Sequence, residues 1–248
     1  MEKFNGCDNA SCGAPTHFKD KFENFWYHYK WHSIVSLFIV FVIIVCSFQM
    51  CQKEKYDAYI LYAGEHEIKK TSSDGDVAEY PSVIASLKRA SEDFDDDGNV
   101  SISLKDLFIM SSEQIEEVEK DGKLEVNTTL IKENREILRE TLLFSDYYVC
   151  FLSPEIYEDY KNIDGVDLFV PLEKYNEKNT GLVYNDASSI YLSSTNFYSL
   201  SGISDLPDDT LVCLRSISAV SSHFDKDGNE KAFSCGEKII KRIINYDY

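Results

Sequence analysis

Residues 56–64 read YDAYILYAG, an almost unbroken run of apolar and aromatic residues that ends in a glycine. Such a run is typical of a β-strand that is covered on both faces, because neither face then meets water. Residues 147–152 read YYVCFL and show the same pattern. Further strands are expected at 100–110, 166–172, 189–192 and 211–215. The chain is therefore expected to build a largely buried sheet.

Helical segments alternate with these strands. Residues 81–93 begin with a proline and place their apolar residues on one stripe, and residues 129–144 form the clearest amphipathic helix. A last helix is expected at 235–245. Strands that alternate with helices predict an α/β fold, here a three-layer domain with a mostly parallel or mixed sheet.

Three short motifs predict where helices begin. Residues 111–114 (SSEQ) and 234–237 (SCGE) have the spacing of a capping box, in which the first and fourth side chains satisfy each other's backbone amides. Residues 153–155 (SPE) place a serine at the N-cap and a proline in the first turn.

An apolar segment near the N-terminus predicts a transmembrane helix. Ser33–Gln52 carries no charged residue, and about 20 apolar residues match a hydrocarbon core of roughly 30 Å. Aromatic residues crowd the segment before it, as at a membrane interface: Phe25, Trp26, Tyr27, Tyr29 and Trp31. We expect an uncleaved signal anchor; a buried core helix and a cleaved signal peptide are the alternatives.

This segment divides the chain into three parts. Residues 1–32 are expected to be a cytoplasmic and juxtamembrane segment, partly an interfacial amphipathic helix, and residues 33–52 the membrane span. Residues 53–248 form the expected extracytoplasmic α/β domain. The reason for this orientation is that a large acidic domain follows the first membrane helix. The sequence thus predicts a single-pass protein of the cell membrane, in contact with the lipid bilayer.

The charge of the chain restricts its partners. Its formal net charge is -18, and residues 1–52 contribute nothing to that excess. A domain of this charge repels nucleic acid and anionic lipid, and it favours cations or basic partners. No nucleic-acid partner is expected, whereas the identity of a protein or small-molecule ligand is left open.

Three cysteines belong to the α/β domain: Cys150, Cys213 and Cys235. Because three is an odd number, a complete disulfide framework is excluded. Cys150 and Cys213 lie inside apolar runs, where buried free thiols are common. Free thiols are expected, and one disulfide among the three remains an alternative.

A ligand site is expected where strands end and helices begin. In open α/β sheets, ligands bind beyond the carboxyl ends of the strands, close to helix N-termini. The turn after the first strand holds Gly64, Glu65 and His66, and the turn after residues 147–152 holds Ser153. These four residues are the candidate ligand-binding residues.

Residues 93–101 (DFDDDGNVS) match the first nine positions of a calcium-binding loop. The candidate ligands are oxygen-bearing residues at alternate positions together with the next acid along the chain: Asp93, Asp95, Asp97, Asn99 and Asp106. Leu104 occupies the place of the usual bidentate glutamate, and a strand is expected where a helix usually follows. A solvated turn between a helix and a strand is the alternative, and no other cofactor is expected.

Catalytic signatures are missing from the sequence. The expected α/β domain has two histidines, His66 and His223, and contains neither a zinc-protease motif, a nucleophile elbow nor a phosphate loop. An enzyme is therefore not the favoured expectation, and a divergent hydrolase built around His66 is kept as an alternative.

The order of these segments resembles a known family. The run from YDAYILYAG through PSVIASLKRASEDF to VSISLKDL, and the later run from YYVCFLSPEIYEDY to VDLFVPLEKY, resemble type 2 periplasmic solute-binding proteins. The layout also resembles uncharacterised membrane-anchored bacterial proteins with a truncated domain of this kind. The resemblance implies a membrane-anchored ligand-binding or sensing module, accessory to a transporter or an envelope complex. The alternative from another class is a non-enzymatic structural or assembly protein that docks a basic partner.

Overall fold

The computed structural model describes residues 17–51, 56–66, 68–71, 77–79, 81–94, 96–120, 127–178, 181–218 and 226–247. The chain divides into two compact units, Met1–Lys55 and Tyr56–Tyr248.

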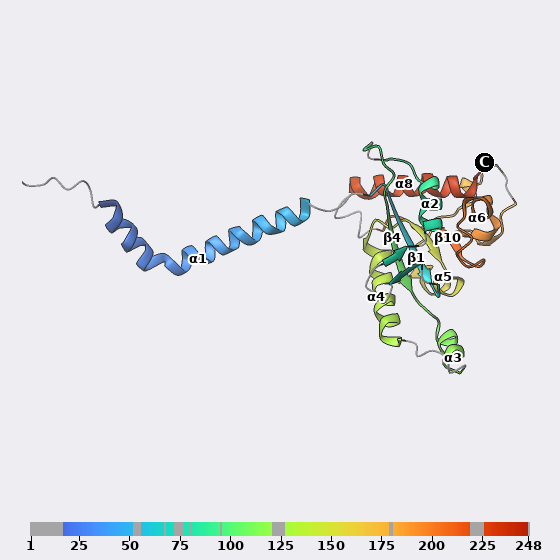
Figure 1. Cartoon of the computed structure of the whole chain (residues 1–248), viewed down its shortest axis with the longest axis horizontal. Helices are drawn as coiled ribbons and strands as arrows, with labels where there is room; N and C mark the ends of the chain where they lie inside the picture. Colours follow the sequence, from blue (N-terminus) through green and yellow to red (C-terminus); the bar gives the residue numbers. More distant parts are fainter. Residues whose placement is uncertain are drawn as a thin grey trace, which may run out of the picture. The chain divides into compact units, whose positions relative to one another are not determined.

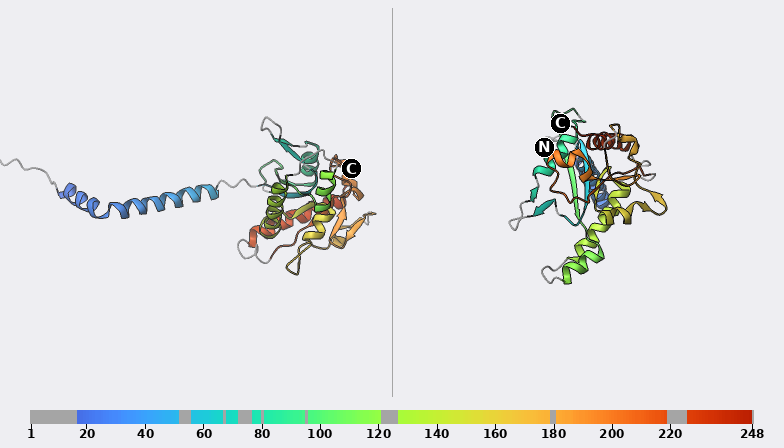
Figure 2. Two further views of the ribbon diagram at one scale, coloured as in Figure 1. Left: turned by 90° about the horizontal axis from the view of Figure 1, so that it is seen from below. Right: turned by 90° about the vertical axis from the view of Figure 1, so that its right-hand side faces the viewer.

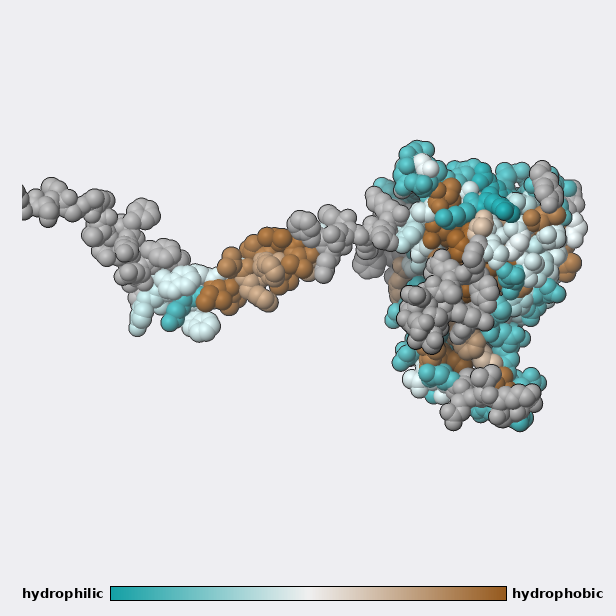
Figure 3. Space-filling view, viewed as in Figure 1, coloured by the Kyte–Doolittle hydropathy of each residue, from teal (hydrophilic) through white to brown (hydrophobic). Residues whose placement is uncertain are grey.

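The first unit contains one long helix, α1 (His17–Cys51). Within it, Tyr29–Ser47 is long and apolar enough to cross a membrane, and no part of that stretch is buried against protein. Figure 3 shows a brown, apolar band over part of this helix. The predicted juxtamembrane helix and the predicted membrane span are therefore parts of one continuous helix.

The second unit is built on a six-stranded sheet with the order β4-β1-β5-β10-β9-β8 (Figure 1). The strands are β1 (Ala58–Gly64), β4 (Ile102–Phe108), β5 (Val149–Leu152), β8 (Tyr184–Asp186), β9 (Ser189–Tyr191) and β10 (Leu211–Leu214). β1 pairs in parallel with β4 on one side and with β5 on the other. β10 is antiparallel to both β5 and β9, and β8 is antiparallel to β9. The predicted α/β fold with a mixed sheet is confirmed.

Helices cover both faces of this sheet (Figure 2). One core cluster joins Val149 and Phe151 of β5 to α2 (Pro81–Ala90), α6 (Asn196–Ser201) and α8 (Lys226–Ile244). The other cluster joins Cys150 and Leu152 of β5 to α4 (Thr128–Phe144) and α5 (Pro154–Tyr160). Alternate residues of β5 face opposite clusters because successive side chains of a strand point to opposite sides. This explains why residues 147–152 are apolar throughout.

The last helix differs from the sequence prediction. α8 begins at Lys226, nine residues before the predicted start at Cys235, so the predicted capping box at 234–237 is wrong and lies inside the helix. Gly228 in the first turn disfavours a helix locally, but tertiary contacts outweigh this preference. Tyr148 donates a hydrogen bond from its hydroxyl to Oδ1 of the buried Asn229, 2.6 Å away. Gly236 lets the helix approach the sheet, because a Cβ there would lie 3.1 Å from Cβ of Tyr148.

Residues 166–172 do not form the single strand that the sequence predicts. Asp164 and Gly165 have positive φ angles, 52° and 82°, and two such residues in succession make the tight turn that suits a hairpin. The turn pairs β6 (Asn162–Ile163) with β7 (Val166–Asp167), and only an isolated bridge from Phe169 to Arg215 follows. A second small hairpin, β2 (Lys69–Thr71) with β3 (Val77–Glu79), is inserted after β1. The remaining elements are short: α3 (Ser112–Lys120), η1 (Glu173–Tyr175) and η2 (Leu192–Ser194).

The three cysteines of the second unit are free. Cys150 and Cys213 are opposite each other on β5 and β10, and both are fully buried. Burial raises the pKa of the Cys150 thiol to about 12, so this thiol stays protonated at neutral pH.

Candidate functional site

The predicted ligand residues meet at the carboxyl ends of β1 and β5. The chain leaves β1 toward β4 on one side, and it leaves β5 toward β10 on the other side. Such a reversal is a topological switch point, the place where open α/β sheets form a crevice for ligands. The backbone amide of Ser153 donates to the carbonyl of Ala63 at 3.0 Å, so the two strand ends adjoin. The structure thus brings Ser153 next to the turn that holds Gly64, Glu65 and His66.

Gly64 allows the crowding at this strand end. A Cβ at this position would lie 2.9 Å from the hydroxyl of Tyr62 and 3.5 Å from Cβ of Ser153. The Tyr62 side chain therefore reaches toward the carboxyl end of its own strand. Burial raises the pKa of Tyr62, partly offset by a hydrogen bond from the backbone of His66.

Glu65 lies among other carboxylates. Partial burial raises the pKa of Glu65, the charges of Asp209 and Glu155 raise it further, and His66 opposes them. Asp209 lies close to these strand ends because β10 runs antiparallel to β5. Leu211, the first residue of β10, pairs with Leu152, the last residue of β5, so the loop that precedes β10 ends where β5 ends. Three carboxylates that repel one another favour a positively charged ligand.

A predicted capping box connects Glu65 to α3. The backbone amide of Ser111 donates to Oε1 of Gln114 at 2.7 Å, and the amide of Gln114 donates to Oγ of Ser111 at 3.2 Å. This reciprocal pair confirms the prediction for residues 111–114. The side-chain nitrogen Nε2 of Gln114 donates to Oε2 of Glu65 at 2.6 Å. This hydrogen bond fixes the direction of the Glu65 carboxylate.

An open groove of about 550 Å³ adjoins these residues. It is lined by residues from the starts of α3 and α5 and from α4: Ser111, Ser112, Glu113, Arg135, Pro154, Glu155, Glu158 and Asp159. Its four carboxylates face one cation, and Arg135 is already paired with Asp159 at 3.1 Å. The groove is therefore acidic, and Glu155 belongs both to it and to the surroundings of Glu65.

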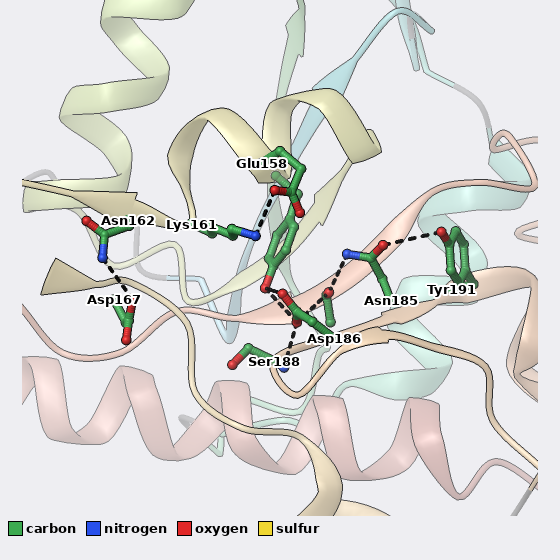
Figure 4. Close-up of polar contacts among 10 residues, drawn as sticks. Glu158, Lys161, Asn162, Asp167, Asn185, Asp186, Ser188 and Tyr191 are labelled. Carbon is green, nitrogen blue, oxygen red and sulfur yellow. Dashed lines mark hydrogen bonds and ion pairs between the residues drawn. The ribbon is translucent and has the colours of Figure 1, made fainter. Parts of the chain in front are cut away.

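Helix α5 begins at this site. A polar network holds it against the edge strand β8 and its neighbour β9 (Figure 4). The hydroxyl of the buried Tyr157 lies 2.8 and 2.7 Å from the two oxygens of Asp186. Asp186 also accepts from the amide of Ser188 at 2.8 Å and from the hydroxyl of Ser189 at 2.9 Å. Burial alone would raise the pKa of Asp186, but these hydrogen bonds lower it below its ordinary value. The network fixes α5 against β8 and β9, and so it positions Ser153 and Glu155.

The four candidate calcium residues that the structure describes are not gathered at one point. The two carboxylate oxygens of Asp93 accept from the backbone amides of Asp97 and Gly98 at 3.1 and 2.7 Å, and Asp97 accepts from the amide of Asn99 at 2.7 Å. Asp106 lies far along β4, where it pairs with Tyr62 and accepts from the amide of Ile68 at 2.8 Å. Asp95 lies outside the described residues.

Within the described part of the chain, no group of three or more His, Cys, Asp or Glu residues is arranged to hold a metal. Calcium binding by residues 93–101 stays a prediction. The contacts seen here are those of a loop closed by its own backbone. Asp57, which is buried, accepts from the amides of Phe94 and Ser101, both at 2.7 Å, and so fastens the two ends of this loop to the start of β1.

Comparison of the chain with protein-family models, with curated proteins and with solved structures finds no match. The resemblance to type 2 periplasmic solute-binding proteins stays a prediction.

Proposed function

We propose that this chain is a single-pass membrane-anchored ligand-binding or sensing module. In this proposal Tyr29–Ser47 crosses the cell membrane, the N-terminus is cytoplasmic, and the α/β domain is extracytoplasmic. The length and apolar composition of the helix support the anchor. A solute-binding-protein-like domain in this position would serve as an accessory to a transporter or an envelope complex.

The ligand proposed for the crevice bears an ammonium or guanidinium group. The observation that carries this is the position of Glu65, beside Ser153 at the switch point and close enough to Asp209 and Glu155 for their charges to raise its pKa. A cationic group would relieve that repulsion and form charge-assisted hydrogen bonds. The acidic groove lined by Glu113, Glu155 and Glu158 extends the same surface to a longer ligand.

The same carboxylates favour the second candidate, a non-enzymatic assembly protein that docks a basic partner. The two candidates differ in the size of the cation that they recognise. A module that binds a solute takes a free small molecule, whereas a docking protein needs several basic side chains on one chain. A divergent hydrolase built around His66 stays a prediction.

Calorimetric titration of the full chain in a neutral detergent tests this proposal. The probes are arginine, spermidine and a short polylysine peptide, with glucose and glutamate as uncharged and anionic comparisons. The variant is Glu65→Gln, which keeps the shape of the side chain and an acceptor for Gln114. The control is Glu173→Gln, which changes an exposed carboxylate of η1 that does not line the acidic groove.

We expect saturable binding of arginine or spermidine that Glu65→Gln weakens about tenfold and that the control leaves within about twofold. Binding of polylysine alone, with the same sensitivity to Glu65, would instead support the assembly protein. If no cation binds, or if both variants weaken binding equally, the crevice is not the site.

A further inference from the structure

A second groove, of about 620 Å³, has the opposite charge. It lies where the C-terminal ends of α2 and α8 approach each other, because Arg242 of α8 donates to the carbonyl of Ser91 at 2.9 Å. Its lining consists mainly of long basic side chains: Arg89, Glu92, Lys178, Lys238, Lys241, Arg242, Asn245, Tyr246 and Asp247. Five cations face two carboxylates there, a net charge of +3, although the chain as a whole carries -18.

Helix ends hold the two guanidinium groups in place. Arg242 caps the C-terminus of α2 through Ser91 and also forms an ion pair with Glu92. Arg89 donates to the carbonyl of Ser201, the last residue of α6, at 3.0 Å. Carbonyls at a helix C-terminus attract cations. The guanidinium groups are therefore preorganised, and each of them keeps further N–H donors.

The lysines of this groove form only exposed ion pairs or a ring contact with other side chains. Lys241 pairs with Glu177 at 2.8 Å and Lys178 pairs with Asp247, and all four of these side chains are about half exposed. Lys238 lies 5.1 Å from the centre of the Phe94 ring, and the described residues give it no carboxylate partner. Exposed ion pairs contribute little free energy, so a stronger anion can displace them.

We propose that this groove binds a multiply charged anion that bears phosphate groups. Its net charge matches a ligand with two or more negative charges, and the flat N–H forks of Arg89 and Arg242 suit phosphate oxygens. Lys238 and Lys241 supply the movable ammonium groups. The proposal does not depend on the acidic groove, because the two grooves share no residue and require ligands of opposite charge.

Isothermal titration of the full chain in a neutral detergent tests this inference, with two phosphate sources. Inorganic tripolyphosphate represents a free solute. Dihexanoyl phosphatidic acid, a phosphomonoester with a charge of about -1.5 to -2 at pH 7, represents a lipid headgroup, with dihexanoyl phosphatidylcholine as its zwitterionic comparison. The variant is Lys238→Gln with Lys241→Gln, which spares the capping arginines. The control is Lys226→Gln with Lys231→Gln, two exposed lysines at the other end of the same helix.

We expect saturable binding of one of the two phosphate sources. The groove variant should weaken this binding at least about tenfold, and the control variant should weaken it less than about twofold. The affinity should fall as the salt concentration rises. Binding of tripolyphosphate identifies a free phosphate ligand, and binding of phosphatidic acid without phosphatidylcholine identifies a lipid headgroup. The inference is overturned if neither source binds, or if the two lysine pairs have equal effects. Melting curves of both variants show whether each is folded.

Discussion

At the scale of single residues, Arg215 is among the largest fully buried side chains that the structure describes. Its guanidinium donates to the carbonyls of Leu142 at 2.9 Å and Tyr147 at 3.2 Å, and also to that of Ser145. It also stacks over the ring of Tyr148, 4.3 Å from the ring centre. Three of these four residues belong to the segment between α4 and β5, so Arg215 holds that connection against β10.

Replacing Arg215 with methionine should destabilise the domain by about 2–4 kcal/mol, because one buried and two partly buried carbonyls lose their donor. Chemical denaturation of the full chain in a neutral detergent measures this change. Arg139→Met, at a largely exposed position of α4, should shift the unfolding free energy by less than about 0.5 kcal/mol. Equal effects of the two substitutions would contradict the role given to Arg215.

The raised pKa of Glu65 predicts a pH effect of a definite sign. The folded state holds a proton on Glu65 more tightly than the unfolded state does. The resulting stability is therefore present below the unfolded pKa and is lost as pH rises through the folded pKa. Without ligand, Glu65→Gln should melt at a higher temperature than the natural chain at about pH 8 and at the same temperature at about pH 3. Melting curves of both chains across this pH range test the prediction. A lower melting temperature of Glu65→Gln at about pH 8 would contradict it.

At the scale of elements, helix starts were predictable where the signal is local, either a capping box or a proline in the first turn, as in α2 and α5. The reciprocal bonds of Ser111 and Gln114 appear as the spacing predicts. The start of α8 was not predictable, because Asn229 and Gly236 are held by Tyr148, far away in sequence. Residue spacing in the sequence is enough to predict a capping box. The continuation of α8 through Gly236 depends on its packing against the sheet, which the sequence does not show.

The start of α4 gives a matched test of a local cap. Asn127 accepts from the amide of Leu130 at 3.1 Å through its side-chain oxygen. Asn127→Ala should therefore lower the unfolding free energy by about 1 kcal/mol, and Asn127→Ser should retain most of the stability because serine also caps. Denaturant titration of both variants measures the difference. Equal loss in the two variants would show that the cap itself is not the cause.

At the scale of the whole molecule, the candidate site was partly visible in the sequence. Gly64, Glu65, His66 and Ser153 follow two strands, and parallel pairing brings the ends of those strands together. Asp209 was not foreseeable, because it reaches the same edge through the antiparallel pairing of β10 with β5. The basic groove was not foreseeable either. Its cations come from segments that are far apart in the sequence, and the chain as a whole has a net charge of -18.

Membrane anchoring by Tyr29–Ser47 is the claim on which the proposed function depends. Alkaline carbonate extraction of membranes from cells that produce the full chain tests it most directly. We predict that the chain stays in the membrane pellet. A variant with Ile39→Arg and Ile43→Arg should move to the soluble fraction, since each charge costs roughly 2.5–3.5 kcal/mol at the centre of a membrane helix. Release of the unaltered chain into the soluble fraction would contradict the account.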